Sequence, residues 1–297
     1  MSEIKAKVIA HSKSAVNGKE IITMELEYPR FCHSEIMTHR LFSRNAASSR
    51  AIPIEKVIEQ VSTSPAVPCH WGKNQSGMQA KEEVTNKINS MGHWIDAASS
   101  AAYHAGKLKH HGLHKQVVNR ILEPFQMMKT VVTATEWDNF FWLRKHPDAQ
   151  PEIKLLAEKM WEALQGSEPN TIDPEGWHVP YYKKGFWMQS MEDSLEDALA
   201  ISSSCCAQVS YRLLDDSLEK ARTIYARLVE SEPVHASPFE HQASPMDYPD
   251  AVDTTELAGI EGATHIDREG NVWSGNFKSW VQYRQLIKNN ACWEYKE

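Results

Sequence analysis

The chain has 297 residues, of which 24% are charged, and a net charge of −7 at pH 7. This composition excludes a disordered or fibrous chain, and the negative charge argues against a general nucleic-acid-binding protein. No apolar window predicts a membrane span, the N-terminus lacks a signal-peptide pattern, and the five cysteines form no CxxC pair, so we expect a cytoplasmic protein with reduced thiols.

The first half of the chain predicts strands and helices in alternation. Apolar and polar residues alternate from Ile22 onward, which is typical of a strand with one buried face. Ser34 can cap a helix that we expect to reach about Arg44, with a polar loop over 46–50. The other predicted elements are strands over 5–12, 20–28 and 127–134, a long loop over 62–80, and helices over 82–106, 115–122, from Thr135 onward, and 151–164.

The last third is less regular. We expect a Pro- and aromatic-rich connection over 167–192, followed by helices over 193–202 and 217–230. Ser237 and Glu240 flank Pro238 and Phe239 in the pattern of a capped helix start. Residues 242–276 are expected to be irregular and 277–289 helical. Since neither a repeat nor a linker is visible, the prediction is a single α+β domain over residues 1–297.

Cationic and hydroxyl side chains are concentrated in one stretch, which reads Thr38-His39-Arg40-Leu41-Phe42-Ser43-Arg44-Asn45-Ala46-Ala47-Ser48-Ser49-Arg50. Small residues in a loop expose backbone N–H donors, and an arginine fork beside them is suited to a phosphate monoester. On composition alone, the same pattern also fits a solvated helix end with capping hydroxyls.

The stretch resembles the signature of the flavin-dependent thymidylate synthases, the ThyX family. That signature reads Arg-His-Arg, two residues, Ser, one residue, Asn, two residues, Ser, one residue, Arg. The chain matches it at His39, Arg40, Ser43, Asn45, Ser48 and Arg50. It departs at Thr38, where the family usually has Arg, and at Ala51, where Tyr commonly follows.

Two later segments extend the resemblance. Residues Asn119–Pro124 are similar to the family's segment Ala-Arg-hydrophobic-hydrophobic-Leu-Pro. Residues Asn139–Arg144, followed by Ala149–Ile153, are similar to its Asn-Phe-x-x-Leu-Arg and Ala-Gln-x-Glu-Ile segments. Thr133 and Thr135 stand where many members have Asn and Arg.

Two family segments come late in this chain instead of early. Residues Ala207–Tyr211 resemble the Ala-Arg-Val-Ser segment, and His235–His241 resemble the His-x-Ser/Thr-Pro-Phe-Glu-His segment. Because the cyclic order is preserved, we expect a circular permutation of the family's α+β fold with its central antiparallel sheet. The parts would be a nucleotide and flavin signature part (20–165), a permuted flavin-binding part (198–241) and an unassigned extension (242–297).

The resemblance implies reductive methylation of dUMP to dTMP in a homotetramer. Methylenetetrahydrofolate would be the carbon donor, FAD the cofactor and NADPH the reductant. The implied dUMP-binding residues are Glu35, Ala47, Ser48, Ser49, Arg50, Arg120 and Arg144. The implied FAD-binding residues are Thr38, His39, Arg40, Asn45, Asn139, Ser210, His235, Ser237 and Glu240. Arg144 is the implied catalytic residue, because an arginine beside the pyrimidine stabilises negative charge as the ring is polarised.

Several of these residues also have structural interpretations. Glu35 could be a surface carboxylate, Arg144 could pair with Asp138 or Asp148, and Ser237 with Glu240 could form only a local cap. The histidines at 110, 111 and 114 lack neighbouring Cys or carboxylate ligands, so no metal site is expected. The adjacent cysteines at 205 and 206 are interpreted as buried small residues.

Two alternatives to thymidylate synthesis stay open. The substitutions at Thr38, Thr133 and Thr135 are compatible with a relative that modifies another pyrimidine nucleotide or leaves a hydroxymethyl group. The chain could also be a non-catalytic homologue that binds flavin or nucleotide. The retention of Ser48, Arg50, Arg120 and Arg144 argues against that second alternative.

Overall fold

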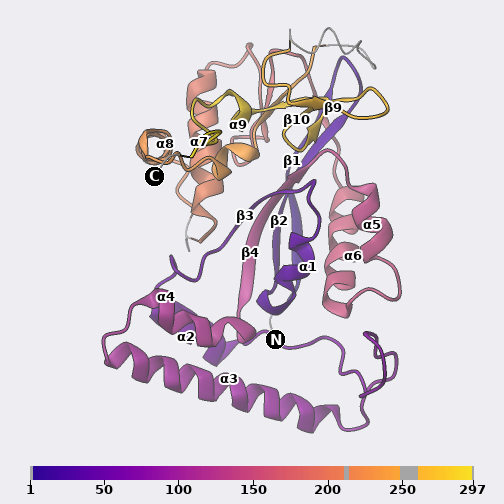
Figure 1. Ribbon diagram of the computed structural model, residues 1–297, viewed down its shortest axis with the longest axis vertical. Helices are drawn as coiled ribbons and strands as arrows, with labels where there is room; N and C mark the ends of the chain where they lie inside the picture. Colours follow the sequence, from indigo (N-terminus) through magenta and orange to yellow (C-terminus); the bar gives the residue numbers. More distant parts are fainter. Residues whose placement is uncertain (1–2, 211–213, 248–259, 296–297) are drawn as a thin grey trace.

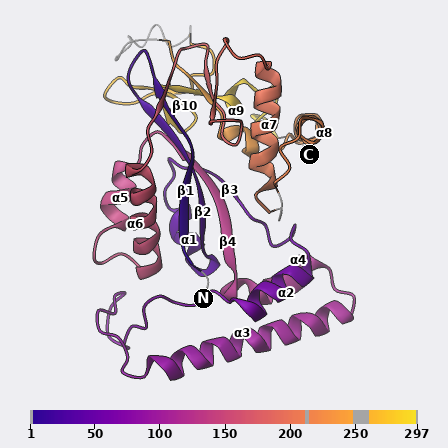
Figure 2. The same cartoon turned by 180° about the vertical axis from the view of Figure 1, so that it is seen from behind.

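A central antiparallel sheet organises the molecule, with a layer of helices at one end and smaller sheets at the other (Figures 1 and 2). The computed structural model describes residues 3–210, 214–247 and 260–295, with the Ser210 side chain left out. Mixed helices and strands confirm the predicted α+β class.

The main sheet has the strand order β3-β4-β2-β1-β5. Its strands are β1 (Lys5–Ser14), β2 (Glu20–Pro29), β3 (Ser43–Ala46), β4 (Met127–Ala134) and β5 (Asn170–Ile172). Only the β1–β5 pair is parallel. The period-two prediction for β2 is confirmed: Ile22, Met24 and Leu26 all lie in the main hydrophobic core.

Two helices cover one face of this sheet, α5 (Asp138–Arg144) and α6 (Pro151–Gln165). Ile153, Leu156 and Met160 of α6 are fully buried against β2, as the predicted amphipathic helix requires. The helix predicted from Thr135 onward begins later, at Asp138, and Thr135 does not cap it. Its hydroxyl instead accepts a hydrogen bond from the Lys278 backbone N–H at 3.0 Å.

The predicted helix from Ser34 to Arg44 is also wrong. Helix α1 covers only His33–Met37, following a short 3-10 turn η1 (Arg30–Cys32), and the chain then forms β3. Ser43–Ala46 pairs with β4, which satisfies backbone groups that a helix would have used internally. Arg44 secures the turn by donating from Nη1 to the carbonyls of Ile36 (3.0 Å) and His39 (2.9 Å).

The helical layer lies at the end of the sheet where β4 begins (Figure 1). It consists of α2 (Ile54–Thr63), α3 (Lys87–His110), α4 (Lys115–Val118) and the 3-10 segment η2 (Asn119–Phe125). Helix α3 begins later than predicted, because the Asn86 side chain accepts from the Asn89 N–H and caps it there. Only Ala98, Ala102 and Ala105 of α3 are buried, and Ile88 is 83% exposed.

The expectation of irregular chain over 242–276 and helix over 277–289 is wrong. A four-stranded sheet has the order β12-β8-β6-β7, and a three-stranded sheet has the order β11-β10-β9. Their strands are β6 (Trp177–His178), β7 (Phe186–Trp187), β8 (Ala243–Pro245), β9 (His265–Ile266), β10 (Val272–Ser274), β11 (Phe277–Lys278) and β12 (Trp280–Gln282). Phe277 and Trp280 are fully buried against Ile21 and Ile172 of the main sheet, so tertiary packing determines these short strands. Only α9 (Tyr283–Leu286) remains of the predicted final helix.

The segment predicted to be permuted forms two packed helices, α7 (Leu195–Ala207) and α8 (Leu218–Glu230). A short turn η3 (Gln208–Ser210) follows α7. The capped helix predicted at Ser237 is instead a 3-10 turn, η4 (Ser237–Glu240), in which no side chain caps the turn. The Glu240 carboxylate pairs with Arg284 of α9.

Candidate functional site

Arg144, at the C-terminal end of α5, is held against the turn that follows α1. Its Nε donates to His39 Nε2 at 2.9 Å and its Nη2 donates to Thr38 Oγ1 at 3.0 Å. Its Nη1 lies 3.6 Å from Glu35 Oε2. The structure therefore brings together four of the predicted site residues from two separate segments. The ion pair with Asp138 or Asp148 considered from the sequence is replaced by the contact with Glu35.

His39 is uncharged in this arrangement. Burial, and then the positive charges of Arg144 and Arg44, lower the pKa of His39 to about 4. A neutral imidazole can accept a hydrogen bond at Nε2 while keeping its proton at Nδ1, as the contact with Arg144 requires. The positive charge of this cluster therefore resides on the guanidinium.

A second polar cluster joins the 46–50 loop to η1 and η2. The buried Ser49 donates from Oγ to Glu123 Oε1 at 2.7 Å. Arg120 Nη1 lies 2.9 Å from the same oxygen, and Arg30 Nη2 lies 3.0 Å from it. A pocket of about 480 Å³ opens beside this cluster. It is lined by Arg30, Phe31, His33, Ser34, Arg120, Glu123 and Pro124.

Two members of this second cluster, Arg30 and Glu123, were missed by sequence reasoning. The signal for Glu123 was present, since it stands at the Leu position of the Ala-Arg-hydrophobic-hydrophobic-Leu-Pro segment. Arg30 has no motif around it and is brought to the cluster by the end of β2.

The loop over 46–50 is fixed by neighbouring backbone. The Ala47 N–H donates to the Lys129 carbonyl at 2.8 Å, so in this structure the main sheet uses a backbone donor of the residue predicted to bind dUMP. Asn119 Nδ2 donates to the carbonyls of Ser49 (2.7 Å) and Ile52 (3.0 Å). The Arg50 side chain is exposed, and the Arg50 backbone N–H donates to Ser48 Oγ at 3.3 Å. The loop thus presents Arg50 to solvent from a fixed backbone.

The late segments lie against the signature strand. Asn45 Nδ2 donates to the Cys206 carbonyl at the end of α7 (3.2 Å). Gln282 Nε2 donates to Ser43 Oγ (3.1 Å) and to the Glu240 carbonyl (3.2 Å). Residues far apart in the sequence are therefore adjacent at β3.

The remaining predicted flavin residues are spread around this region. The side chains of Arg40, Asn139, His235 and Ser237 are exposed. The Ser210 side chain lies outside the described residues. A guanidinium, an imidazole, an amide and a hydroxyl are suitable donors for a diphosphate and for polar ring edges, so the donor set fits FAD.

A buried hydrogen-bond network connects the two larger sheets. His178 is bound by Ser12 Oγ (2.9 Å) and Thr23 Oγ1 (2.8 Å), and Thr133 Oγ1 bonds both Thr23 Oγ1 (2.7 Å) and His241 Nδ1 (2.8 Å). Burial lowers the pKa of each of the two histidines to about 3. Thr133, which stands where many family members have Asn, is therefore a member of this network.

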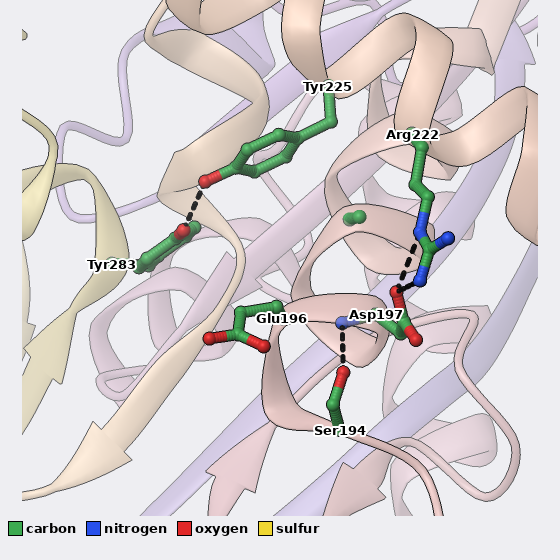
Figure 3. Close-up of a pocket in the computed structure, with 7 residues that line it drawn as sticks. Ser194, Glu196, Asp197, Arg222, Tyr225 and Tyr283 are labelled. Carbon is green, nitrogen blue, oxygen red and sulfur yellow. Dashed lines mark hydrogen bonds and ion pairs between the residues drawn. The ribbon is translucent and has the colours of Figure 1, made fainter.

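A separate pocket of about 260 Å³ lies between α7, α8 and α9 (Figure 3). Arg222 of α8 donates from Nε (3.0 Å) and Nη2 (2.8 Å) to Asp197 Oδ1 of α7. The hydroxyls of Tyr225 and Tyr283 lie 2.6 Å apart. Figure 3 shows these pairs spanning neighbouring elements, so they hold α8 against α7 and α9.

None of the five cysteine side chains forms a disulfide. All five cysteines are free, and Cys205 and Cys206 are buried, as predicted. Burial raises the pKa of the Cys205 thiol to about 12 and that of Cys206 well above its ordinary value, which makes both poor nucleophiles.

Among residues 3–210, 214–247 and 260–295, no group of three or more His, Cys, Asp or Glu side chains is placed to hold a metal ion. Within the same ranges, no helix combines the length and apolar character needed to cross a membrane.

Comparison with known proteins places the chain in a family. The sequence profile of the Thy1 family, described as thymidylate synthase complementing protein, matches residues 3–170. This match spans more than half of the chain, and the chain therefore belongs to the Thy1 family. A comparison with curated protein sequences gives no match.

Solved structures include similar folds at low identity. The UMP/dUMP methylase PolB from Streptomyces cacaoi, bound with 5-Br dUMP, is 16% identical with a TM-score of 0.46, over 56% of this chain and 91% of that chain. ThyX from Helicobacter pylori, with FAD and dUMP, is 17% identical with a TM-score of 0.35, over 50% of this chain and 68% of that chain. The family assignment rests on the sequence profile.

Proposed function

We propose that this protein is a flavin-dependent thymidylate synthase, which converts dUMP to dTMP with methylenetetrahydrofolate as carbon donor and NADPH as reductant. The observation that carries the proposal is the fixed Arg144, held by Glu35, Thr38 and His39. Family membership supports the reaction class, because the matched region contains the whole signature stretch.

Arg144 is proposed as the catalytic residue. A guanidinium held by three neighbours would stabilise the negative charge of a polarised uracil ring beside it, and fixed charge of this kind stabilises a transition state without reorganisation. The neutral His39 supports this role, since it orients Arg144 without adding a second positive charge to the cluster. Glu35, whose carboxylate faces Nη1, would restrict the position of the Arg144 side chain from the side opposite His39.

The phosphate of dUMP is assigned to the second cluster. Ser48, Ser49, Arg50 and Arg120 lie on or beside the fixed 46–50 loop, and their hydroxyl and guanidinium groups are suitable phosphate donors. The residues proposed to hold FAD are Thr38, His39, Arg40, Asn45, Asn139, Ser210, His235, Ser237 and Glu240. FAD, when bound there, would supply the redox chemistry of the methyl transfer.

The circular permutation is part of this proposal. It is supported by the contacts that place α7 and η4 beside β3, so that the late segments lie next to the signature despite their position in the chain. We also propose a single catalytic domain, a homotetramer and a cytoplasmic location, the last in keeping with the free cysteines.

A second candidate is the modification of a different pyrimidine nucleotide or the formation of a hydroxymethyl product. It is favoured by Thr133 and Thr135, which bond His241 and the Lys278 backbone respectively. The surroundings of a bound flavin or pyrimidine would therefore differ from those in members with Asn and Arg at these positions.

The test is an anaerobic product assay with FAD, NADPH, methylenetetrahydrofolate and dUMP, read by mass spectrometry of the nucleotide. We expect a gain of one methylene unit, reduced roughly 10²–10³-fold in Arg144→Ala. The matched control is Arg268→Ala, an exposed arginine in the turn between β9 and β10. Conversion of dCMP but not dUMP, or a hydroxymethyl product, would favour the second candidate.

A further inference from the structure

We propose that the Glu123 carboxylate acts as an internal anion among the donors Ser49, Arg30 and Arg120, and that it limits how tightly a nucleotide 5′-phosphate binds there. This inference deepens the proposed function and rests on it only for the identity of the ligand as a nucleotide. Glu123 occupies a position where the family segment has Leu, so the feature is a departure of this chain.

The geometry around Glu123 is that of a bound anion. A single oxygen, Oε1, receives Ser49 Oγ at 2.7 Å and lies 2.9 Å from Arg120 Nη1 and 3.0 Å from Arg30 Nη2. One hydroxyl and two guanidiniums around one oxygen are the donor set that a phosphate oxygen would require. Two of these donors, Ser49 and Arg120, are the ones the family resemblance assigns to dUMP.

The site is accessible to a ligand. Glu123 keeps 23% of its side-chain surface exposed and lines the pocket of about 480 Å³, together with both arginines. His33 also lines this pocket, and burial with the nearby Arg30 and Arg44 lowers its pKa, so it adds no positive charge near neutral pH. The two guanidiniums are therefore partly neutralised by Glu123.

The consequence is a competition between two anions. A phosphate that reaches Ser49, Arg30 and Arg120 must displace the carboxylate or lie beside a like charge, and either event weakens binding. A leucine at this position would leave the arginines free for the ligand. The wild-type protein should therefore bind phosphate monoesters more weakly, and release them more readily, than the same site without the carboxylate.

The experiment compares dUMP, inorganic phosphate and deoxyuridine binding by calorimetry in wild type, Glu123→Gln and Glu123→Leu. We expect both variants to bind dUMP and phosphate about tenfold more tightly, with deoxyuridine binding unchanged because it carries no phosphate. Gln keeps a hydrogen-bond acceptor for Ser49, and Leu is the family residue, so two different replacements guard against loss of fold, which thermal unfolding checks. Glu55→Gln, which removes a surface carboxylate paired with Lys109, is the matched control and should bind as wild type does.

The outcomes separate this inference from the proposed function. Unchanged or weaker dUMP binding in folded Glu123→Gln would overturn the inference, even if wild type converts dUMP to dTMP. Tighter phosphate binding in both variants would support it, even if dUMP is not converted by wild type, which would count against the proposed function alone.

Discussion

Arg144 and His39 show how one residue's charge state is set by another. The imidazole accepts from the guanidinium at 2.9 Å, and the guanidinium helps to keep that imidazole neutral. Neither property is visible in a motif, because the two residues are far apart in the sequence. At this scale the site consists of one cation, one neutral acceptor, one hydroxyl supplied by Thr38, and one carboxylate supplied by Glu35.

Removal of Arg144 should change the pKa of His39 directly. In Arg144→Ala, we expect the pKa of His39 to rise from about 4 toward the ordinary value, since one of the two nearby positive charges is lost and burial is relieved. The measurement is an NMR titration of the His39 ring. In Arg268→Ala the value should stay near 4, and an unchanged His39 pKa in Arg144→Ala would contradict the interpretation.

The turn between α1 and β3 determines where the signature side chains lie. Thr38 and His39 follow a helix of only five residues, which is too short to be stable without tertiary contacts. Arg44, the second residue of β3, provides such a contact, because its side chain donates to the Ile36 and His39 carbonyls of the preceding segment. The turn that carries Thr38 and His39 is therefore held in place by a residue of the main sheet.

Loss of Arg44 should destabilise the protein more than loss of its neighbour Arg40. We expect Arg44→Ala to lower the free energy of unfolding by about 1–3 kcal/mol, because two part-buried carbonyls lose their donor. Arg40→Ala, at an exposed position, should change it by less than about 0.5 kcal/mol. Urea unfolding of the two variants measures the difference, and equal effects would argue against a closing role for Arg44.

At the scale of the whole molecule, the buried hydrogen-bond network connects the family-matched part to the C-terminal part. Ser12, Thr23 and Thr133 belong to the main sheet, whereas His178 lies in β6 and His241 directly precedes β8. Hydrophobic contacts of Trp280 and Phe277 with Ile21 and Ile172 reinforce the same junction. The two histidines in this junction are fully buried, and burial keeps both imidazoles neutral.

Acid should therefore weaken the folded state through these histidines. Both have a folded pKa of about 3, below the unfolded value of about 6.5, so the unfolded state binds more protons between these pH values. The free energy of unfolding is unaffected above about pH 6.5. At lower pH it decreases, by on the order of 1 kcal/mol per pH unit for each histidine.

Urea unfolding at pH 7.5 and pH 5 measures this loss. His241→Gln, which keeps a hydrogen-bonding side chain toward Thr133, should reduce the dependence on pH, and His111→Gln, at an exposed position, should not. A pH dependence that is the same in His241→Gln and wild type would exclude His241 as its source.

The sequence by itself determined the family, the main strands, α6 and most of the candidate site residues. These features depend on local patterns: fixed motif spacing around His39 and Arg50, alternation along β2, and the apolar face of α6. Such patterns act within a few residues, so a single chain is enough to detect them.

Only the tertiary structure decided the course of Ser43–Ala46, the C-terminal strands and the partners of the site residues. Strands β3 and β8 are short, and their hydrogen-bond partners are distant in the sequence, so local propensity does not specify them. The same reason applies to the anion-like contacts of Glu123 and to the neutral state of His39, since both arise from burial and charge that distant segments supply.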